Sequence, residues 1–442
     1  MSAKTFREQL KGDRLESGFA EAKPLYSQSE AQIEANRCLF CYDAPCITAC
    51  PTAIDIPGFI RKIGTGNIRG SAKTIFEANM LGTSCARVCP VDVLCVGACV
   101  YNDLNSEPIH IGRLQRYATV TALAKEAASG RKLFKAKPRV AKKVALVGGG
   151  PASLACAAYL ELEGVQAVIY ERDELPGGLN TTGIAPYKLD TEGSLNEVDW
   201  LLSHGAEIRT GVGVGVDVSA KDLLTEYDAV FIGTGLGKDR MLDLGTELSP
   251  YVLGATELIR DIKNTSGFEI SEDVTTAVII GGGNTAIDIA RELALLGVAN
   301  VVMVYRRSEK EMSGYRHEMA GARKQGVRLV EKATPVKVVE AGGRITGLEV
   351  TTDGVSRVIP CDLIVQAIGQ ESLVARLGFD IEINDRGHVV VDPETMRTSA
   401  SNIYAGGDCI NGGKEVVNAA ADGREAAFSM LRSWGMEPSL AR

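Results

Sequence analysis

The sequence predicts an α-helical N-terminal domain followed by two nested α/β domains, and three observations support this order. A short apolar strand, a glycine-rich turn and an apolar helix follow one another twice, at 143–162 and at 276–296. Before them, residues 1–140 show helical rather than alternating apolar patterns. Eight of the eleven cysteines fall within that first part, between residues 38 and 99. We therefore expect a cysteine-rich helical domain ahead of two α/β units.

The composition is that of an ordinary globular protein. The chain has 442 residues, of which 24% are charged and 45% hydrophobic, enough for two to four domains. A net charge of −8 gives no reason to expect binding to nucleic acid or to an anionic membrane. The first residues lack the apolar core of a secretory signal, and no run approaches the ~20 apolar residues of a membrane helix. We therefore expect a cytoplasmic protein.

Elements outside the repeated units can also be placed. In the first domain, amphipathic patterns predict helices at 33–40, 56–66, 71–79 and 111–127. The basic stretch 131–139 is expected to be a solvated linker, and a docking strip for a partner is the alternative. Near the end of the chain, a strand at 402–405 leads into a glycine-rich turn and a closing helix at 419–431.

The cysteine spacing indicates metal binding. The eight residues read Cys-x2-Cys-x4-Cys-x3-Cys-Pro, then Cys-x3-Cys-Pro, then Cys-x3-Cys. Thiolates that end in Cys-Pro are typical of iron–sulfur ligands, because soft sulfur donors hold soft iron. In a reducing compartment, clustered cysteines more often bind metal than form disulfides, so a disulfide framework is the minor alternative. Eight ligands are enough for two four-iron clusters, which carry electrons one at a time.

The first α/β unit has the features of a dinucleotide-binding, Rossmann-like fold. Strands at 143–147 and 166–170 flank a turn in which Gly148 and Gly150 allow backbone N–H groups to approach a pyrophosphate. Ser153 replaces the third glycine and is still small enough for helix–strand packing. Glu171 ends the second strand, where a carboxylate can accept hydrogen bonds from ribose hydroxyls.

The second unit repeats the pattern with a different charge at its end. Gly281, Gly283 and Ala286 fill the glycine positions after the strand 276–280. The strand at 300–305 is followed not by an acid but by Arg306 and Arg307. Arginine favours a 2′-phosphate, so this site favours NADP over NAD, and NAD stays open.

Two nucleotide folds need one ligand each. Nicotinamides donate two electrons at once as hydride, whereas clusters accept single electrons. A flavin converts between the two. The economical assignment is therefore FAD in the first fold and NAD(P)H, as substrate, in the second.

Three motifs resemble those of pyridine-nucleotide–disulfide-type flavoproteins. They are the stretch 147–152 with Glu171, the stretch 231–235, and the stretch 404–408 with its aspartate. The resemblance implies two nested Rossmann-like domains of that type. However, Cys156, Cys361 and Cys409 are isolated in sequence and are expected to be buried small residues. This argues against a disulfide reductase.

With the N-terminal cysteines, the chain resembles a smaller group. It includes the small subunit of glutamate synthase and the FAD/iron–sulfur half of NAD(P)-dependent dihydropyrimidine dehydrogenase. The resemblance implies a helical domain at 1–140 with two [4Fe–4S] clusters, an FAD-binding domain at 141–255 and 371–442, and an NAD(P)H-binding domain at 256–370. Gln115 matches the position of a glutamine cluster ligand in the pyrimidine enzyme, where the glutamate synthase subunits typically have glutamate, so it favours the former.

The resemblance also implies particular ligands. The first cluster would be held by Cys38, Cys41, Cys46 and Cys99, and the second by Cys50, Cys89, Cys95 and Gln115. Cys85 is left spare, although spacing alone would choose it over Gln115. The implied cofactor-binding residues are Gly148, Gly150, Pro151, Ala152, Ser153, Glu171, Gly178, Leu179, Thr234, Gly235, Gly281, Gly283, Asn284, Thr285, Arg306, Arg307, Gly369, Gly407 and Asp408.

The implied function is electron input to a hetero-oligomer. NAD(P)H would reduce FAD, and electrons would leave through both clusters to a PreA-like large subunit that carries FMN and its own clusters and reduces uracil or thymine. No catalytic residue for pyrimidine reduction is expected in this chain. The alternatives are the small subunit of NADPH-dependent glutamate synthase and a non-catalytic, redox-sensing iron–sulfur scaffold.

Overall fold

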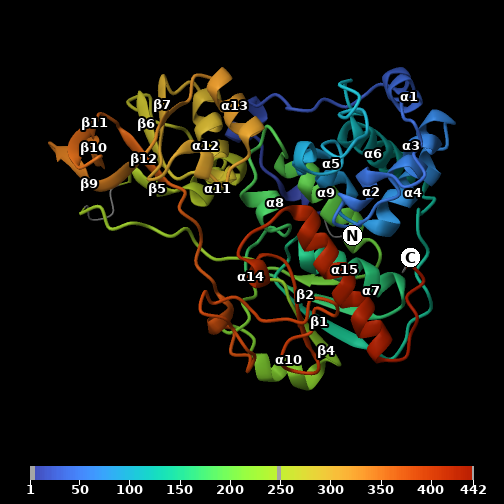
Figure 1. The fold of residues 1–442 in the computed structure, drawn as a ribbon. Coiled ribbons are helices and arrows are strands. Elements are labelled where there is room, and N and C mark those ends of the chain that lie inside the picture. Colours follow the sequence, from blue (N-terminus) through green and yellow to red (C-terminus); the bar gives the residue numbers. More distant parts are fainter. Residues whose placement is uncertain (1–4, 246–249, 441–442) are drawn as a thin grey trace.

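The N-terminal part is helical, as the sequence predicts. A computed structural model of the chain describes residues 5–245 and 250–440 (Figure 1). Its first part is built on large apolar side chains that are fully buried, among them Phe59, Ile75 and Phe76. The elements are η1 (Arg7–Gln9), η2 (Leu15–Gly18), α1 (Gln28–Asn36), α2 (Pro45–Thr48), α3 (Ile56–Gly64), α4 (Ile68–Ala78), α5 (Gly82–Val88), η3 (Val91–Val93) and α6 (Ile111–Ser129).

One of the four predicted helices in this part is misplaced. The helix expected at 33–40 is α1, which begins at Gln28 because Ser27 and Glu30 form a capping box. The helix ends at Asn36, and the chain turns through Phe40 in the left-handed region, with φ of 52°. The first cysteines therefore lie on a loop and can face the domain interior from several directions.

The first α/β domain is built on a parallel sheet in the order β13-β4-β1-β2-β3. Apart from Gln166, which is exposed, and Lys143, the residues of β1 and β2 are buried, as expected for a sheet covered on both faces. The elements are β1 (Lys143–Val147), α7 (Pro151–Leu162), β2 (Gln166–Tyr170), α8 (Leu179–Thr182), α9 (Thr191–Leu202), β3 (Glu207–Arg209), α10 (Ala220–Glu226), β4 (Ala229–Ile232), β13 (Ile403–Ala405), α14 (Asp408–Asn411) and α15 (Val416–Ser433).

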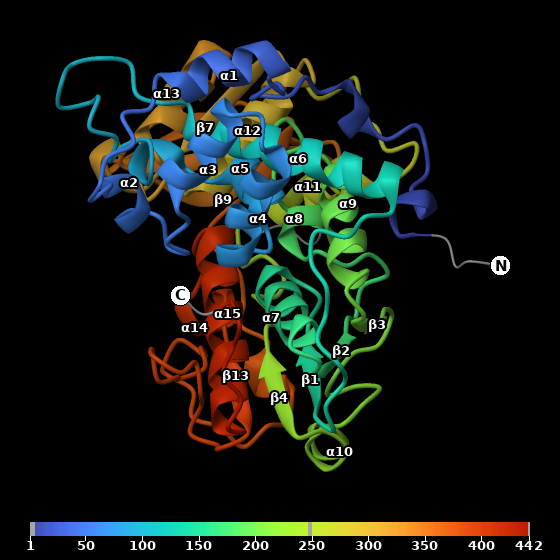
Figure 2. The ribbon, with the colours of Figure 1, turned by 90° about the vertical axis from the view of Figure 1, so that its right-hand side faces the viewer.

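Helices α7 and α15 lie side by side on one face of this sheet (Figure 2). Gly423 permits their close approach, since a Cβ there would lie 2.1 Å from the carbonyl oxygen of Ala152. The helical domain sits across one end of this helix pair (Figure 2). The first residues of α15 therefore face the cysteine-rich segment.

The second α/β domain repeats the architecture with the sheet order β5-β12-β6-β7-β8. Strand β5 pairs with β12, so this sheet begins at Val252, and the structure favours a domain limit slightly before the predicted residue 256. The elements are β5 (Val252–Gly254), α11 (Ala255–Asn264), β6 (Thr276–Ile280), α12 (Asn284–Leu295), β7 (Asn300–Val304), η4 (Glu309–Glu311), α13 (Arg316–Lys324), β8 (Arg328–Val330), an antiparallel sheet of β9 (Ala333–Ala341), β10 (Arg344–Thr352) and β11 (Val355–Ile359), β12 (Leu363–Gln366) and, in the return to the first domain, η5 (Val374–Arg376).

The basic stretch 131–139, expected to be a solvated linker, is mostly exposed and connects the helical domain to the first α/β domain. In the basic stretch 131–139, Lys137 pairs with Glu163 and Arg139 pairs with Glu161, so the linker is held against the first α/β domain. No helix among the described residues is both long enough and apolar enough to cross a membrane.

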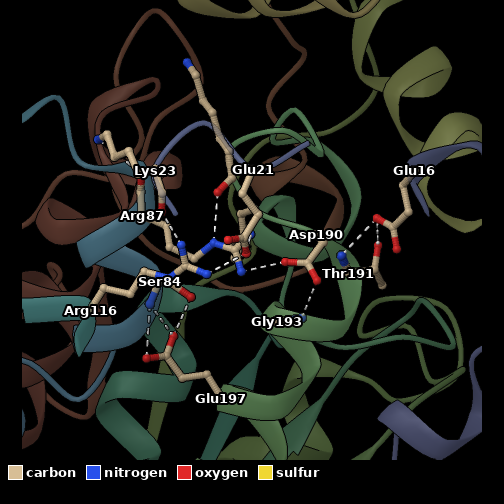
Figure 3. Close-up of polar contacts among 12 residues, drawn as sticks. Glu16, Glu21, Lys23, Ser84, Arg87, Arg116, Asp190, Thr191, Gly193 and Glu197 are labelled. Carbon is tan, nitrogen blue, oxygen red and sulfur yellow. Dashed lines mark hydrogen bonds and ion pairs between the residues drawn. The ribbon is translucent and has the colours of Figure 1, made fainter. Parts of the chain in front are cut away.

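Buried polar contacts join the helical domain to the first α/β domain (Figure 3). The carboxylate of Glu197, on α9, accepts hydrogen bonds from the backbone N–H groups of Thr83 (2.7 Å) and Ser84 (3.1 Å) and from the Ser84 hydroxyl. These groups form the first turn of α5, where unpaired N–H groups favour a negative charge. Burial nevertheless raises the pKa of Glu197 to about 6.

A second contact ties the same two helices together. Arg87, near the end of α5, pairs with Asp190, the N-cap of α9, at 2.6 Å, and its Nε donates to the carbonyl oxygen of Lys188 at 3.0 Å. Helix α5 is thus held at both ends by the first α/β domain. The second α/β domain is joined by the buried Lys263, whose Nζ donates to the carbonyl oxygens of Asn180, Ile184 and Leu189, and burial lowers its pKa to about 8.

Replacing Glu197 by Ala is expected to destabilise the protein by roughly 3 kcal/mol, because the buried donors of α5 lose their acceptor. Thermal melting of the purified protein should show a transition several degrees lower. The matched control is Glu192→Ala on the same helix. Glu192 is exposed and pairs with Arg7 at 3.7 Å, so its loss should cost less than about 1 kcal/mol. Equal shifts of the melting temperature in both variants would contradict the proposed role of Glu197 as the acceptor for the first turn of α5.

Candidate iron–sulfur and dinucleotide sites

The eight clustered cysteines line two separate cavities. The structure thus brings together the members of each predicted ligand set and adds Cys85 to the second. The first cavity is lined by Cys38, Cys41, Cys46 and Cys99. The second is lined by Cys50, Cys85, Cys89, Cys95 and Gln115.

Local structure explains how these side chains reach their cavities. Cys46 lies on α2, four residues before Cys50, yet the two thiols face different cavities. Cys89 is the C-cap of α5 and is followed by Pro90, which cannot continue a helix. Gln115 lies in the second turn of the buried helix α6. The positions of α5 and α6 therefore decide the shape of the second cavity.

The donor chemistry fits iron–sulfur clusters, because thiolates hold iron and four or five cysteine or glutamine side chains line each cavity. All eleven cysteines are free thiols. Among residues 5–245 and 250–440, no three His, Cys, Asp or Glu side chains are placed to hold one metal ion. A four-iron cube is larger than one ion, and its ligands surround a cavity of the kind seen here. Burial raises the pKa of Cys46 and Cys95 to about 12, so iron binding would displace thiol protons.

Cys85 and Gln115 both line the second cavity. Cys85 is part of helix α5, and Gln115 contacts the first residue of that helix, Gly82. Cys85 is buried on α5, and its thiol is a hydrogen-bond partner of the Cys89 thiol. The amide nitrogen of Gln115 donates to the carbonyl oxygen of Gly82 at 2.8 Å. This bond leaves the amide oxygen of Gln115 as the atom that could bind a metal. Gln115 as a ligand, with Cys85 spare, stays a prediction.

The turn of the first α/β domain is shaped for a pyrophosphate. Gly148 has φ of 94°, and a Cβ there would lie 2.7 Å from the carbonyl oxygen of Gly233. Gly150 is the N-cap of α7, followed by Pro151, Ala152 and Ser153 in the first turn, so the helix N-terminus opens toward the turn. Gly178, with φ of 54°, backs this turn and precedes Leu179 at the start of α8. All these predicted residues lie at one edge of the sheet.

Polar atoms around this turn fit FAD. Glu171 accepts hydrogen bonds from the N–H groups of Gly149 (2.6 Å) and Asp173 (2.8 Å), and burial raises its pKa. The buried hydroxyls of Ser153 and Thr234 have no hydrogen-bond partner among the described residues, as expected for groups that await a ligand.

The predicted second FAD motif lies at the carboxyl end of β13, the outer strand of the same sheet. Gly407, with φ of 78°, lets the chain turn so that Asp408 begins α14. Burial raises the pKa of Asp408, which accepts a hydrogen bond from the Lys414 N–H at 3.0 Å. Gly235 follows Thr234 in the left-handed region, with φ of 61°.

The turn of the second α/β domain is built in the same way. Gly281 has φ of 152°, and a Cβ there would lie 2.3 Å from the carbonyl oxygen of Ala367. Gly283 is the N-cap of α12, which begins with Asn284 and Thr285. The side chain of Asn284 accepts a hydrogen bond from the Tyr315 N–H at 3.0 Å, and so also fixes the loop before α13. Gly369, with φ of 106°, lies in the loop after β12.

Two cations stand at the end of β7. Arg306 and Arg307 are both exposed. The Arg307 guanidinium lies 5.5 Å from the ring centroid of Tyr305, while the Arg306 side chain makes no ion pair with any residue in the described ranges. Exposed guanidinium groups at this position suit a ribose phosphate.

Sequence reasoning missed two residues that shape the second cavity. Asn79 lines it from the end of α4, and Val417 lines it from α15 of the first α/β domain. No sequence signal marks either one, because a single Asn or Val in a helical pattern has many ordinary roles. In contrast, Cys156, Cys361 and Cys409 are buried, as expected.

Fold and sites together define an NAD(P)H-dependent flavin and iron–sulfur oxidoreductase that transfers electrons. Residues 14–127 match the family described as dihydropyrimidine dehydrogenase domain II, 4Fe-4S cluster, and residues 142–423 match pyridine nucleotide-disulphide oxidoreductase. The chain belongs to this pyridine nucleotide-disulphide oxidoreductase family, in the group that carries the iron–sulfur domain.

Two relatives from Escherichia coli K12 match almost their whole length. The chain is 32% identical to the glutamate synthase [NADPH] small chain, over 93% of both proteins. It is 34% identical to the NAD-dependent dihydropyrimidine dehydrogenase subunit PreT, over 92% of this chain and 95% of PreT. The fold of the α/β domains is similar to that of T. acidophilum thioredoxin reductase, with a TM-score of 0.53 at 22% identity, over 66% of this chain and 99% of that one.

Replacing Cys85 by Ala is expected to leave iron content and the iron–sulfur absorption spectrum intact, because Cys85 is spare in the predicted set. Cys95→Ala, matched in chemistry and in cavity, should lose about half of the iron, since it removes a predicted ligand. Iron and acid-labile sulfide assays on anaerobically purified protein measure both. Loss of a whole cluster in Cys85→Ala would overturn the assignment of Gln115.

Proposed function

We propose that this chain is the electron-input subunit of a hetero-oligomeric dihydropyrimidine dehydrogenase. In this proposal it oxidises NAD(P)H at FAD and passes electrons through two [4Fe–4S] clusters to a PreA-like partner, which reduces uracil or thymine to the 5,6-dihydro form. The glycine-rich turn after β1 would hold FAD, and the turn after β6 would hold NAD(P)H. The two cysteine-lined cavities would hold the clusters. When bound, FAD takes up electron pairs and releases single electrons, which the clusters carry onward.

The observation that carries this proposal is the position of the second cavity. Val417, from α15, forms part of its wall, so the cavity lies directly against the domain that carries the first nucleotide site. Helix α15 begins at Val416, eight residues after Asp408, the predicted FAD contact. One short stretch of chain therefore connects the predicted FAD contact to the wall of the second cavity.

The first cavity is suited to be the outlet. Leu39 lines it and directly follows the predicted ligand Cys38 in the chain, while Tyr42 directly follows Cys41. These two large hydrophobic side chains are 53% and 99% exposed. Exposed apolar groups next to predicted cluster ligands support a docking surface for the subunit that accepts the electrons. The expected order is therefore flavin site, second cavity, first cavity and partner.

The small subunit of NADPH-dependent glutamate synthase is the second candidate. Gln115 in the second cavity supports the pyrimidine enzyme, since that enzyme's glutamine ligand is the matching residue. Arg306 and Arg307 support an NADP-dependent enzyme, and the relative named for NADPH is the glutamate synthase small chain. The two relatives match this chain almost equally well, so the partner subunit decides between them.

Anaerobic addition of NADPH or NADH to the isolated chain is expected to bleach the flavin absorption, because the nicotinamide and flavin sites lie in one polypeptide. Steady oxidation of the nicotinamide with an artificial one-electron acceptor should follow. A flavin that stays oxidised with both nucleotides would show that the proposed role is wrong. Bleaching without turnover would favour the redox-sensing scaffold. Identification of the co-purifying large subunit then separates the two enzymes.

Replacing Leu39 and Tyr42 together by Ser is expected to lower electron transfer to the co-purifying large subunit at least tenfold, because two exposed anchors are removed. Turnover with the small artificial acceptor should stay unchanged, since the nucleotide sites are untouched. Val216→Ser, at an equally exposed apolar position in the first α/β domain, is the control. Unchanged transfer to the partner would rule out this surface as the outlet.

A further inference from the structure

Asn79 presents an unpaired amide N–H₂ group at the wall of the second cavity. It is the C-cap of α4, only 1% of its surface is exposed, and it lines the cavity together with the cysteines. Its Nδ2 atom is buried and has no hydrogen-bond partner among the described residues. A buried donor without a partner costs about 1–3 kcal/mol, so such a group in a well-packed domain calls for a physical reason.

The orientation of this amide is fixed by its neighbours. The Oδ1 atom of Asn79 accepts a hydrogen bond from the Leu81 N–H at 2.9 Å. Because a backbone N–H can only donate, the amide cannot be flipped without losing this bond. The Asn79 N–H in turn donates to the carbonyl oxygen of Ile75 at 2.8 Å. The nitrogen end of the side chain is therefore the end left for the cavity.

The segment around Asn79 is held on both sides. Arg424, from α15, donates to the carbonyl oxygen of Ala78 at 2.7 Å. Gln115, from α6, donates to the carbonyl oxygen of Gly82 at 2.8 Å. The amide is thus pre-positioned by the flavin-side domain and by a predicted cluster ligand, before any cluster is bound.

We propose that Asn79 Nδ2 donates a hydrogen bond to a sulfur atom of the cluster in the second cavity and makes the reduction potential of that cluster less negative. The inference rests on the proposed function, which places a cluster there. On reduction the cluster gains one electron, and no bond forms or breaks. The added charge lies partly on sulfur, so a donor stabilises the reduced form more than the oxidised form.

The first cavity supplies an internal comparison. Apart from cysteines, the only polar side chain among the described residues that line it is Tyr101, and its hydroxyl donates to the carbonyl oxygen of Arg37 at 2.7 Å. That cavity has no side-chain donor equivalent to Asn79. The effect of Asn79 should therefore be confined to one of the two clusters.

The test is a redox titration of the full-length protein followed by electron paramagnetic resonance. Asn79→Leu removes both ends of the amide, whereas Asn79→Asp keeps an acceptor for the Leu81 N–H, removes the donor and adds a negative charge. The Leu variant therefore measures the loss of the hydrogen bond, and the Asp variant adds the effect of the charge in the same direction. Both variants should keep full iron content and shift one cluster to a more negative potential. A tenfold loss of preference for the reduced form corresponds to ~59 mV for one electron. Tyr101→Phe, in the first cavity, should leave the potential of the cluster in the second cavity unchanged.

Full iron content with an unchanged potential in both variants would overturn the inference. If Asn79→Leu loses iron, the wild-type protein labelled with ¹⁵N-asparagine decides. Coupling of this nitrogen to the reduced second cluster in pulsed spectra supports the hydrogen bond, and its absence overturns it. A wild-type protein that contains flavin but only one cluster would instead contradict the proposed function itself, and the two failures are distinguishable by iron content.

Discussion

The structure depends on one buried contact, that between helices α5 and α9. Glu197 satisfies the first turn of α5, and Arg87 ties its last turn to Asp190. Between these two points the helix carries Cys85, and it ends at Cys89. The first α/β domain therefore does more than support the helical domain from outside. It holds the element that shapes the second cavity, and it does so with charged groups. Removing one partner of such a buried contact leaves the other uncompensated, at a cost of about 3–5 kcal/mol.

The contact between α5 and α9 also fixes the distance between sites in different domains, which matters for electron transfer. A route for electrons needs neighbouring sites that keep their separation, which a flexible linker between domains cannot provide. Here Arg424 of α15 also donates to the carbonyl oxygens of Thr52 and Ala78, whose chain neighbours Pro51 and Asn79 line the second cavity. Hydrogen bonds thus tie the helical domain to the flavin-side domain. The second α/β domain is attached through Lys263 and through a largely buried network in which Lys188 pairs with Asp288 (2.7 Å) and Glu318 (2.8 Å).

Much of this organisation could be predicted from the sequence because it depends on local residue patterns. Strands β1, β2, β6 and β7, with the turns after β1 and β6, follow from apolar runs ahead of glycines, and the grouping of cysteines agrees with the ligand sets that the family resemblance implies. The start of α1 was missed because the capping box at Ser27 outweighs the apolar spacing further along. Asn79 and Val417 could not be found, since their roles depend on three helices meeting in space. The choice between Cys85 and Gln115 is equally invisible to spacing, because both face one cavity.

The short stretch from Cys46 to Cys50 has a consequence for how the protein matures. These two cysteines are separated by one turn of chain, yet they belong to opposite cavities. A cluster placed in either cavity would fix the direction in which the other's thiol points. Whichever site is loaded first therefore orders part of the ligand set of the other, so the second site is loaded into a wall that is already shaped. The order of loading is in this sense set by a single turn of chain that the two sites share.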